Sequence, residues 1–274
     1  MPAIASEPAG RMELAWIIAV HQSRDVLRKR WVIAYAVGLI LAGDLMLRLA
    51  GSGPSVLVSL LNVVLLLIPL IALILGAASL YSASEFTELL LAQPIPRRSL
   101  FIGLYFGLTV PLAAATVLGL VLPFVFERAL DATTAPTLAM LVVVSVLLVC
   151  VFTALAFLVT ICVRDRARGL GVAIMGWLGV AVLYDGVVLA LASAFRDWPI
   201  ERGMLAAMVF NPIDLARTIL LIRLDAAALM GYTGALFRAA FGSTAGVALA
   251  ALALCVWVAV PWWLSARAFD RRDF

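Results

Sequence analysis

Two residue types that many enzymes depend on are almost missing from this chain of 274 residues. Its only lysine is Lys29, so a phosphate-binding loop of the form G-x-x-x-x-G-K-[ST] cannot occur. Its only histidine is His21, which rules out a serine–histidine pair, an HExxH zinc motif or a Cys/His metal cluster within the membrane. We therefore expect no catalytic residue, no metal site and no cofactor in this chain.

Cysteine and charge are also scarce. The three cysteines, Cys150, Cys162 and Cys255, all fall inside apolar runs and imply no disulfide framework. Charged residues make up 13% of the chain and hydrophobic residues 65%, with a mean hydropathy of +1.13. A soluble domain has about a quarter of its residues charged. This composition indicates an integral membrane protein.

Six apolar runs are long enough to cross a bilayer as helices, which takes roughly 20 residues. They are also too long for the strands of a barrel, and they lack the alternation of apolar and polar residues that such strands show. We predict an all-α, polytopic membrane protein with six transmembrane helices. The predicted spans are Trp31–Leu49, Val56–Leu80, Leu100–Phe126, Leu138–Val163, Leu170–Phe195 and Ala245–Ala266.

The distribution of basic residues predicts the orientation of these spans. With the N-terminus inside, 13 of the 20 lysines and arginines fall on the cytoplasmic side, in loops much shorter than the outer ones. Both termini are therefore expected in the cytoplasm. The sequence pI of about 9.3 reflects this topology, because no basic face with interleaved aromatic residues suggests nucleic acid. The N-terminal residues 1–10 lack the pattern of a cleaved signal peptide.

We predict two parts in the chain. Residues 1–30 form a cytoplasmic tail and an amphipathic helix that lies in the inner membrane interface, because residues 11–30 place apolar and charged side chains on opposite sides at helical spacing. Residues 31–274 form a single six-helix transmembrane domain. Within it, residues 196–243 are an outer-face segment and residues 267–274 a cytoplasmic tail.

The segment Ser82–Ser99, between the second and third spans, differs from a simple connecting loop. It contains two acids, the apolar triplet Leu89-Leu90-Leu91, two prolines and two arginines. The pattern predicts a short amphipathic helix ended by Pro94, with Arg97 and Arg98 at the cytoplasmic surface. Such a helix could bind a soluble partner, or its leucines could rest on lipid.

Two aspartates fall within the predicted spans. Asp44 stands one helical turn from Arg48, which favours a local ion pair at the outer surface. Asp185 lies well inside the fifth span, where a carboxylate usually faces a cavity or a partner. It could serve a transport pathway, hydrogen-bond to a neighbouring helix, or remain protonated. Gly103 and Gly107 in the third span are spaced to allow close helix packing.

The outer segment carries a clear helix start at Asn211-Pro212-Ile213-Asp214. Asn211 is suited to cap the helix, Pro212 to occupy its first position, and Asp214 to lie near its positive end. The helix that follows is apolar, but Arg217, Arg223 and Asp225 interrupt it too often for it to span the membrane. We predict one or two re-entrant or surface-lying helices on the outer face before the sixth span.

Together these features resemble the ABC-2 type transporter permeases, most closely the permease of the system that matures the copper enzyme nitrous oxide reductase. The likeness covers nearly the whole chain. It rests on Arg24-Asp25-x-x-Arg28-Lys29-Arg30-Trp31, on Leu89-Leu90-Leu91-x-x-Pro94-x-x-Arg97 with Gly103 beyond it, on Asp185, and on Asn211-Pro212-Ile213-Asp214-x-x-Arg217.

This resemblance implies a permease in the bacterial inner membrane, acting as a homodimer in which each copy engages a separate ABC ATPase subunit that binds ATP and magnesium. A periplasmic β-helical accessory protein would bind outside, and export is the expected direction. The resemblance also implies three sets of functional residues. They are Glu85, Thr87, Glu88, Leu89, Leu90, Pro94 and Arg97 for ATPase coupling, Asn62 and Asp185 along the passage, and Asn211, Pro212, Asp214 and Arg217 for outer docking.

Two other functions remain open at this point. The chain could be a membrane anchor or assembly platform that transports nothing, in which case no cargo would stimulate its ATPase partner. It could instead be an intramembrane aspartyl protease that uses Asp44 and Asp185. This last alternative is weaker, because Leu41-Ala42-Gly43-Asp44 lacks the first glycine of that family's motif and Arg48 would keep Asp44 ionised.

Overall fold

The computed structural model describes residues 11–50, 54–83, 96–132, 134–194, 207–223 and 244–271. Within these ranges every regular element is a helix, so the predicted all-α class is confirmed. The helices are α1 (Arg11–Leu27), α2 (Arg30–Ala50), α3 (Pro54–Ser82), α5 (Arg97–Phe126), α6 (Thr134–Cys162), α7 (Arg166–Leu178), the π-helical turn η1 (Gly179–Leu183), α8 (Tyr184–Ala194), α10 (Pro212–Arg223) and α12 (Thr244–Arg271).

The six predicted spans are confirmed as helices long and apolar enough to cross a membrane. Five are single helices, and their ends differ from the predicted ends by a few residues. The fifth span, Arg166–Leu191, is built from α7, η1 and α8, which follow one another without a break. The π-helical turn inside it was not predicted, because apolar periodicity says nothing about a single extra residue in a turn.

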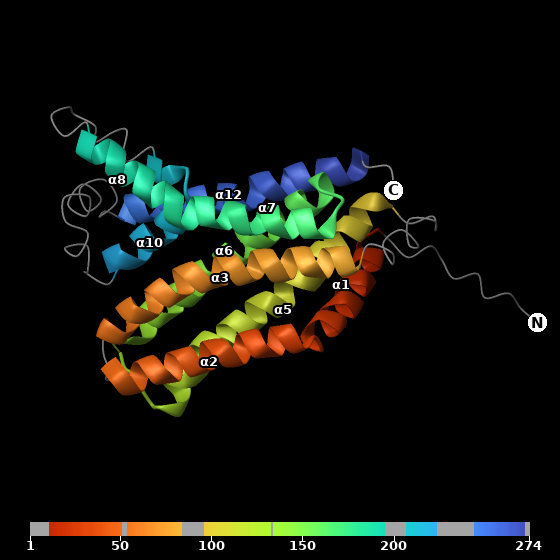
Figure 1. The fold of residues 1–274 in the computed structure, drawn as a ribbon. Helices are drawn as coiled ribbons and strands as arrows, with labels where there is room; N and C mark the ends of the chain where they lie inside the picture. The colour runs from red at the N-terminus through yellow and green to blue at the C-terminus, as the bar shows by residue number, and fades with distance from the viewer. Residues whose placement is uncertain are drawn as a thin grey trace, which may run out of the picture.

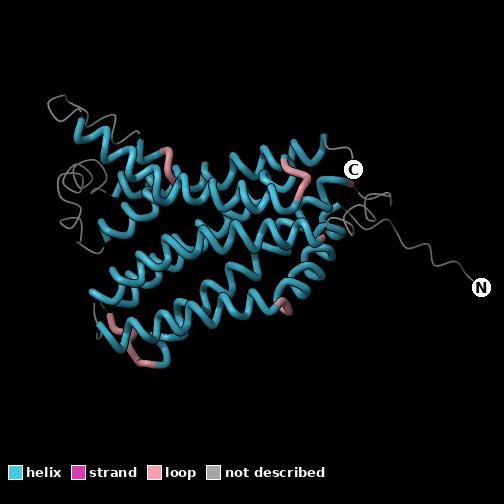
Figure 2. The backbone as a smooth tube through the Cα atoms, in the orientation of Figure 1, coloured by secondary structure: helices cyan, strands magenta, loops and turns pink. Residues whose placement is uncertain are grey.

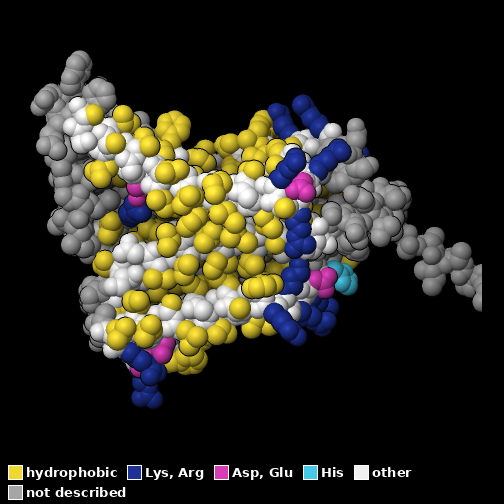
Figure 3. All heavy atoms as spheres, in the orientation of Figure 1, with side chains coloured by type: hydrophobic (Ala, Val, Ile, Leu, Met, Phe, Trp, Pro, Cys, Tyr) yellow, Lys and Arg dark blue, Asp and Glu magenta, His cyan; other side chains and the backbone are white. Residues whose placement is uncertain are grey.

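The long helices run side by side from one end of a bundle to the other (Figures 1 and 2). We call the end where α1 and the last turn of α12 lie the near end, and the opposite end the far end. On the face shown in Figure 3, lysine and arginine side chains gather at the near end, and hydrophobic side chains cover much of the area between the two ends. This matches the predicted clustering of basic residues. That the near end faces the cytoplasm remains a prediction.

Three of the spans form the core and three lie around it. In the most apolar window of α3, α5 and α6, 50%, 56% and 56% of the residues are buried. The corresponding values are 28% for α2, 6% for the α7–α8 span and 22% for α12. The mean hydropathies of the core windows are 2.9, 2.2 and 3.0, and those of the peripheral windows are 1.9, 2.0 and 1.9, so the three core spans are also the three most apolar ones.

The predicted close packing at Gly103 and Gly107 is confirmed, and its partner is α1. A Cβ atom on Gly103 would lie 2.7 Å from the Cβ of Ile18, and one on Gly107 would lie 2.5 Å from the Cβ of Gln22. Both distances are too short for real atoms, so α1 can lie against α5 only because these residues have no side chain. The N-terminal helix is therefore seated on the third span.

Candidate functional site

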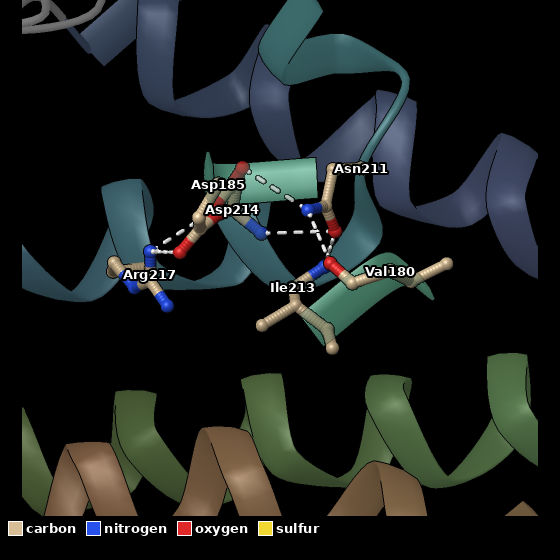
Figure 4. Close-up of polar contacts among 6 residues, drawn as sticks. All are labelled: Val180, Asp185, Asn211, Ile213, Asp214 and Arg217. Atoms are coloured by element: carbon tan, nitrogen blue, oxygen red, sulfur yellow. Dashed lines mark hydrogen bonds and ion pairs between the residues drawn. The ribbon is translucent and has the colours of Figure 1, made fainter. Parts of the chain in front are cut away.

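The candidate site is built around the start of α10. Asn211 caps this helix as predicted, because its Oδ1 accepts hydrogen bonds from the backbone N–H groups of Ile213 at 2.9 Å and Asp214 at 3.4 Å (Figure 4). Pro212 occupies the first helical position, where its missing N–H leaves no carbonyl unpaired. α10 packs against α3, α6 and α12, and most of its side chains are buried.

The same asparagine also joins α10 to the fifth span. Its Nδ2 donates to the carbonyl of Val180 at 2.9 Å and to the carboxylate of Asp214 at 3.1 Å. Val180 belongs to η1, and π-helical turns of this kind often occur where a helix is adapted to a functional contact. Only 1% of Asn211 is exposed, so all of its hydrogen bonds are made within the protein.

An arginine on α10 lies between two carboxylates from different helices. Nη1 of Arg217 is 2.8 Å from Oδ2 of Asp185 on α8 and 3.0 Å from Oδ1 of Asp214, one turn earlier on α10 (Figure 4). Asp185 therefore has a partner on a neighbouring helix, which was one of the possibilities that the sequence left open. We call Asp185, Asn211, Asp214 and Arg217 the far-end polar cluster.

Burial changes the acidity of this cluster. Removal from water raises the pKa of Asp214 to about 7, and the nearby Asp185 carboxylate adds to this effect. The Arg217 guanidinium and the Asn211 amide act in the opposite direction, because both favour the ionised carboxylate. Two carboxylates thus share one cation, and at Asp214 the effect of burial outweighs the attraction of the arginine.

Two further hydrogen bonds hold the residues just before α10. The hydroxyl of Tyr184, on α8, donates to the carbonyl of Ala207. Nε1 of Trp257, on α12, donates to the carbonyl of Val209 at 2.9 Å. Residues 207–211 are thus attached to the fifth span on one side and to the sixth span on the other.

The cluster offers structural rather than catalytic chemistry. Among the residues that the structure describes, no group of three or more His, Cys, Asp or Glu could hold a metal ion. Asp44 is paired with Arg48 at 2.9 Å, while Asp185 is paired with Arg217. Each aspartate therefore has its own arginine, an arrangement that does not favour the shared proton of an aspartyl protease dyad.

The predicted site residues fall into three groups. Asp185, Asn211, Pro212, Asp214 and Arg217 come together, although the sequence assigned them to two separate roles. Asn62 does not join them: its side chain is exposed and donates to the carbonyl of Val58 in its own helix at 3.4 Å. Of the proposed coupling residues, Glu85, Thr87, Glu88, Leu89, Leu90 and Pro94 lie outside the described residues.

The described flanks of the coupling segment are both fixed to other spans. On the side before it, the Tyr81 hydroxyl donates to the carbonyl of Val163 at 2.7 Å, at the turn between the fourth and fifth spans. On the side after it, Nη1 of Arg97 donates to the carbonyl of Asp270 at 3.0 Å, and Nε of Arg98 lies 3.4 Å from the carboxylate of the same residue. The segment thus begins and ends on residues that contact other parts of the bundle.

Sequence reasoning missed the attachments made by Tyr184, Trp257 and Arg217. The signal for one of them was present. An arginine in an apolar outer helix and an aspartate in an apolar span are each unfavourable alone, and opposite charges in such places tend to pair. The hydrogen bonds of Tyr184 and Trp257 to backbone carbonyls left no such signal, because any carbonyl can accept them.

The fold and this site define a polytopic all-α membrane protein with six spans, a seated N-terminal helix and a short helix tied into one end of the bundle. A family model described as ABC-2 family transporter protein matches residues 16–274. The chain therefore belongs to the ABC-2 transporter family, as an ABC transporter permease subunit.

Two curated relatives agree with this family. The chain is 28% identical over 277 residues to a protein of Pseudomonas aeruginosa described as probable ABC transporter permease protein NosY. It is 27% identical over 280 residues to a protein of Stutzerimonas stutzeri with the same description. Each alignment covers 95% of this chain and 99% of the relative.

Proposed function

We propose that this chain is the membrane-spanning subunit of a transporter in which a separate ABC ATPase subunit supplies the energy. The observation that carries this proposal is the family match over residues 16–274, supported by two permease relatives aligned over almost their whole length. The sequence agrees with a division of labour, since its single lysine leaves no phosphate-binding loop. ATP and magnesium would then be bound by the partner alone.

The ATPase would dock on residues 82–99, with Glu85, Thr87, Glu88, Leu89, Leu90, Pro94 and Arg97 as the contacts. Closure of the ATPase around nucleotide would move this segment, and rigid attachments would pass the movement into the spans. The bonds from Tyr81 to Val163 and from Arg97 to Asp270 support this, because both flanks of the segment are held by other parts of the bundle.

Two copies of the chain would form the working unit in the bacterial inner membrane, with both termini in the cytoplasm. The low burial of the α7–α8 span and of α2 supports a homodimer, because these helices have faces that no other described helix covers. Asn62 and Asp185 would lie along the passage. Pro212, Asn211 and Asp214 are buried, so their part in binding an outer protein would be to position α10 rather than to touch the partner.

The proposed role of the transporter is to support the maturation of a periplasmic copper enzyme such as nitrous oxide reductase. It would do so by exporting its cargo, and it would act together with a periplasmic β-helical accessory protein. This part rests on the two relatives described as NosY and on the sequence motifs already given. No metal bound to this chain is needed for it.

The test uses the purified complex of this chain with its ATPase subunit. Glu88→Ala and Arg97→Ala should each lower transport-coupled ATP hydrolysis several-fold, while Arg128→Ala, at the far end of the bundle, should leave it unchanged. In cells, the same two variants should lower the copper content of nitrous oxide reductase. ATP hydrolysis by the isolated chain, or coupling that survives both changes together, would contradict the proposal.

The same experiment separates transport from an anchoring role. A membrane anchor or assembly platform predicts that the ATPase subunit binds and hydrolyses ATP at a rate that no cargo changes. A permease predicts that cargo raises the rate in the wild-type complex and that Glu88→Ala abolishes this increase.

A further inference from the structure

We propose that α12 carries movement from the ATPase contact at the near end to the far-end polar cluster, with Phe269 and Trp257 as the positioning residues at its two points of attachment. This inference rests on the proposed function, because it concerns how the movement of residues 82–99 reaches the other side of the bundle.

The near half of α12 is fixed to the start of α5, directly after the coupling segment. The ring of Phe101 lies 5.7 Å from the ring of Phe269 and 5.7 Å from that of Trp262. Phe101 and Phe269 are 2% and 5% exposed, so this contact is dry and well packed. Together with the bond from Arg97 to the Asp270 carbonyl, it ties the end of the coupling segment to the last turns of α12.

The far half of α12 is attached to the residues that lead into α10. The indole N–H of Trp257 donates to the carbonyl of Val209, two residues before Asn211. Asn211 caps α10 and binds the carbonyl of Val180 in the fifth span. A shift of Trp257 would therefore act on a segment whose other attachments lead directly into the far-end polar cluster.

A proline separates the two attachments. Pro261 has no N–H group, so it cannot donate to the carbonyl of Trp257, four residues earlier in the helix. A helix that lacks this hydrogen bond bends more easily at that point. The near half of α12 can thus change its angle to the far half at the residue that holds Val209.

Of the three helices that pack most closely against α10, α12 is the least buried. α10 contacts α3, α6 and α12. The apolar windows of α3 and α6 are 50% and 56% buried, whereas that of α12 is 22% buried. A displacement of α3 or α6 would require the core to repack, and packed cores resist small displacements. α12 can shift with fewer rearrangements.

The experiment measures movement at the far end of the complete complex with its ATPase subunit, reconstituted in lipid nanodiscs. In a background where Cys150, Cys162 and Cys255 are replaced by serine, Phe210→Cys is labelled with a polarity-sensitive fluorophore. Phe210 is suitable because its side chain is 72% exposed and adjoins the cluster. The signal is the change in emission between the nucleotide-free complex and the complex trapped with ATP, magnesium and vanadate.

Trp257→Phe keeps an aromatic ring and removes the N–H donor. Trp263→Phe is the matched control on the same helix. The ring centroid of Trp263 lies 3.6 Å from the guanidinium carbon of Arg267. We divide the emission change of each variant by its rate of ATP hydrolysis. This ratio should be at least two-fold smaller in Trp257→Phe than in the wild type, and it should be unchanged in Trp263→Phe. Phe269→Leu should reduce it to a similar degree. The double variant Trp257→Phe with Phe269→Leu should lose little more than either single variant, because both act on one path.

The outcomes for this inference differ from those for the proposed function. If the complex hydrolyses ATP and the label responds equally in wild type and Trp257→Phe, the role of α12 is overturned while the permease function stands. The role of α12 is likewise overturned if the wild-type label does not respond at all, or if Trp263→Phe reduces the response as much as Trp257→Phe. If no complex with an ATPase forms, the proposed function itself fails.

Discussion

Two arginines at the far end of this bundle have nearly the same partners in very different surroundings. Arg48 lies 2.9 Å from Asp44 and 3.1 Å from Glu127, and Arg217 lies 2.8 Å from Asp185 and 3.0 Å from Asp214. Each is one cation between two carboxylates. The side chain of Arg48 is 66% exposed, whereas that of Arg217 is 28% exposed.

The difference between these clusters shows that the distance between two charges does not by itself determine how much an ion pair contributes to stability. Ion pairs at an exposed surface contribute about 0–1 kcal/mol, because water screens the attraction and already solvates each charge. When one partner of a buried pair is removed, the charge left behind loses both its partner and its solvation, and the loss is typically about 3–5 kcal/mol. The Arg217 cluster is partly buried and should lie between these limits.

The largest expected effect comes from removing each arginine in turn. Arg217→Met should lower the free energy of unfolding by about 3 kcal/mol, because it leaves the buried Asp214 carboxyl and the partly exposed Asp185 carboxylate without their cation. Arg48→Met should lower it by less than about 1 kcal/mol. Reversible unfolding in mixed micelles would measure both values.

A second change sharpens this result. Adding Asp185→Asn to Arg217→Met removes the carboxylate that has lost its cation and that repels Asp214, so the double variant should recover part of the lost stability. Equal losses for Arg217→Met and Arg48→Met would mean that the two surroundings do not differ as their exposures suggest.

A smaller effect is expected from the asparagine that joins the cluster to the fifth span. Asn211→Ala should lower the stability by about 2 kcal/mol, since it removes a helix cap, worth about 1 kcal/mol, and a buried hydrogen bond to Val180, worth about 1 kcal/mol. Asp165→Ala is the matched control. Asp165 caps α7 through the N–H of Arg168 at 2.7 Å but lies in an exposed turn. The control should lose about 1 kcal/mol, and a loss as large as that of Asn211→Ala would show that the contact with Val180 contributes nothing.

The last expected effect is a dependence of stability on pH, which the Asp214 carboxyl should cause. The pKa of Asp214 is raised from 3.8 to about 7 on folding, chiefly by burial, so the folded protein binds a proton that the unfolded chain releases. The contribution of Asp214 to the free energy of unfolding is greatest below about pH 4, and it is lost as the pH rises towards 7. The wild type should therefore be less stable at pH 8 than at pH 5, by roughly 2 kcal/mol.

Asp214→Asn should remove this part of the pH dependence, while Asp44→Asn in the exposed cluster should leave it as in the wild type. Thermal unfolding at pH 5 and pH 8 would compare the three proteins. An equal pH dependence in the wild type and in Asp214→Asn between pH 5 and pH 8 would show that Asp214 is already ionised at pH 5 in the folded protein.

Much of the fold could be predicted from the sequence, and much of the candidate site could not. The six spans follow from hydropathy, and the start of α10 follows from Asn211 and Pro212, because caps and first-turn prolines act within a few residues. The pairing of Asp185 with Arg217 joins residues 32 positions apart, and nothing in the local sequence fixes which helix faces which. The same holds for Gly103, whose spacing predicted a close neighbour but not that the neighbour would be α1.

The sequence by itself determined that the chain enters the membrane, how many times it can cross, where its helices begin and where its basic residues cluster. These properties depend on the transfer of each segment between water and lipid, and on backbone bonds within one helix. Tertiary structure decided which faces of α3, α5 and α6 pack against one another, because mean hydropathy ranks these three spans highest but does not fix which helix faces which. It also decided that Arg217 is partly buried between its aspartates while Arg48 remains exposed, since burial depends on neighbours that are distant in the chain.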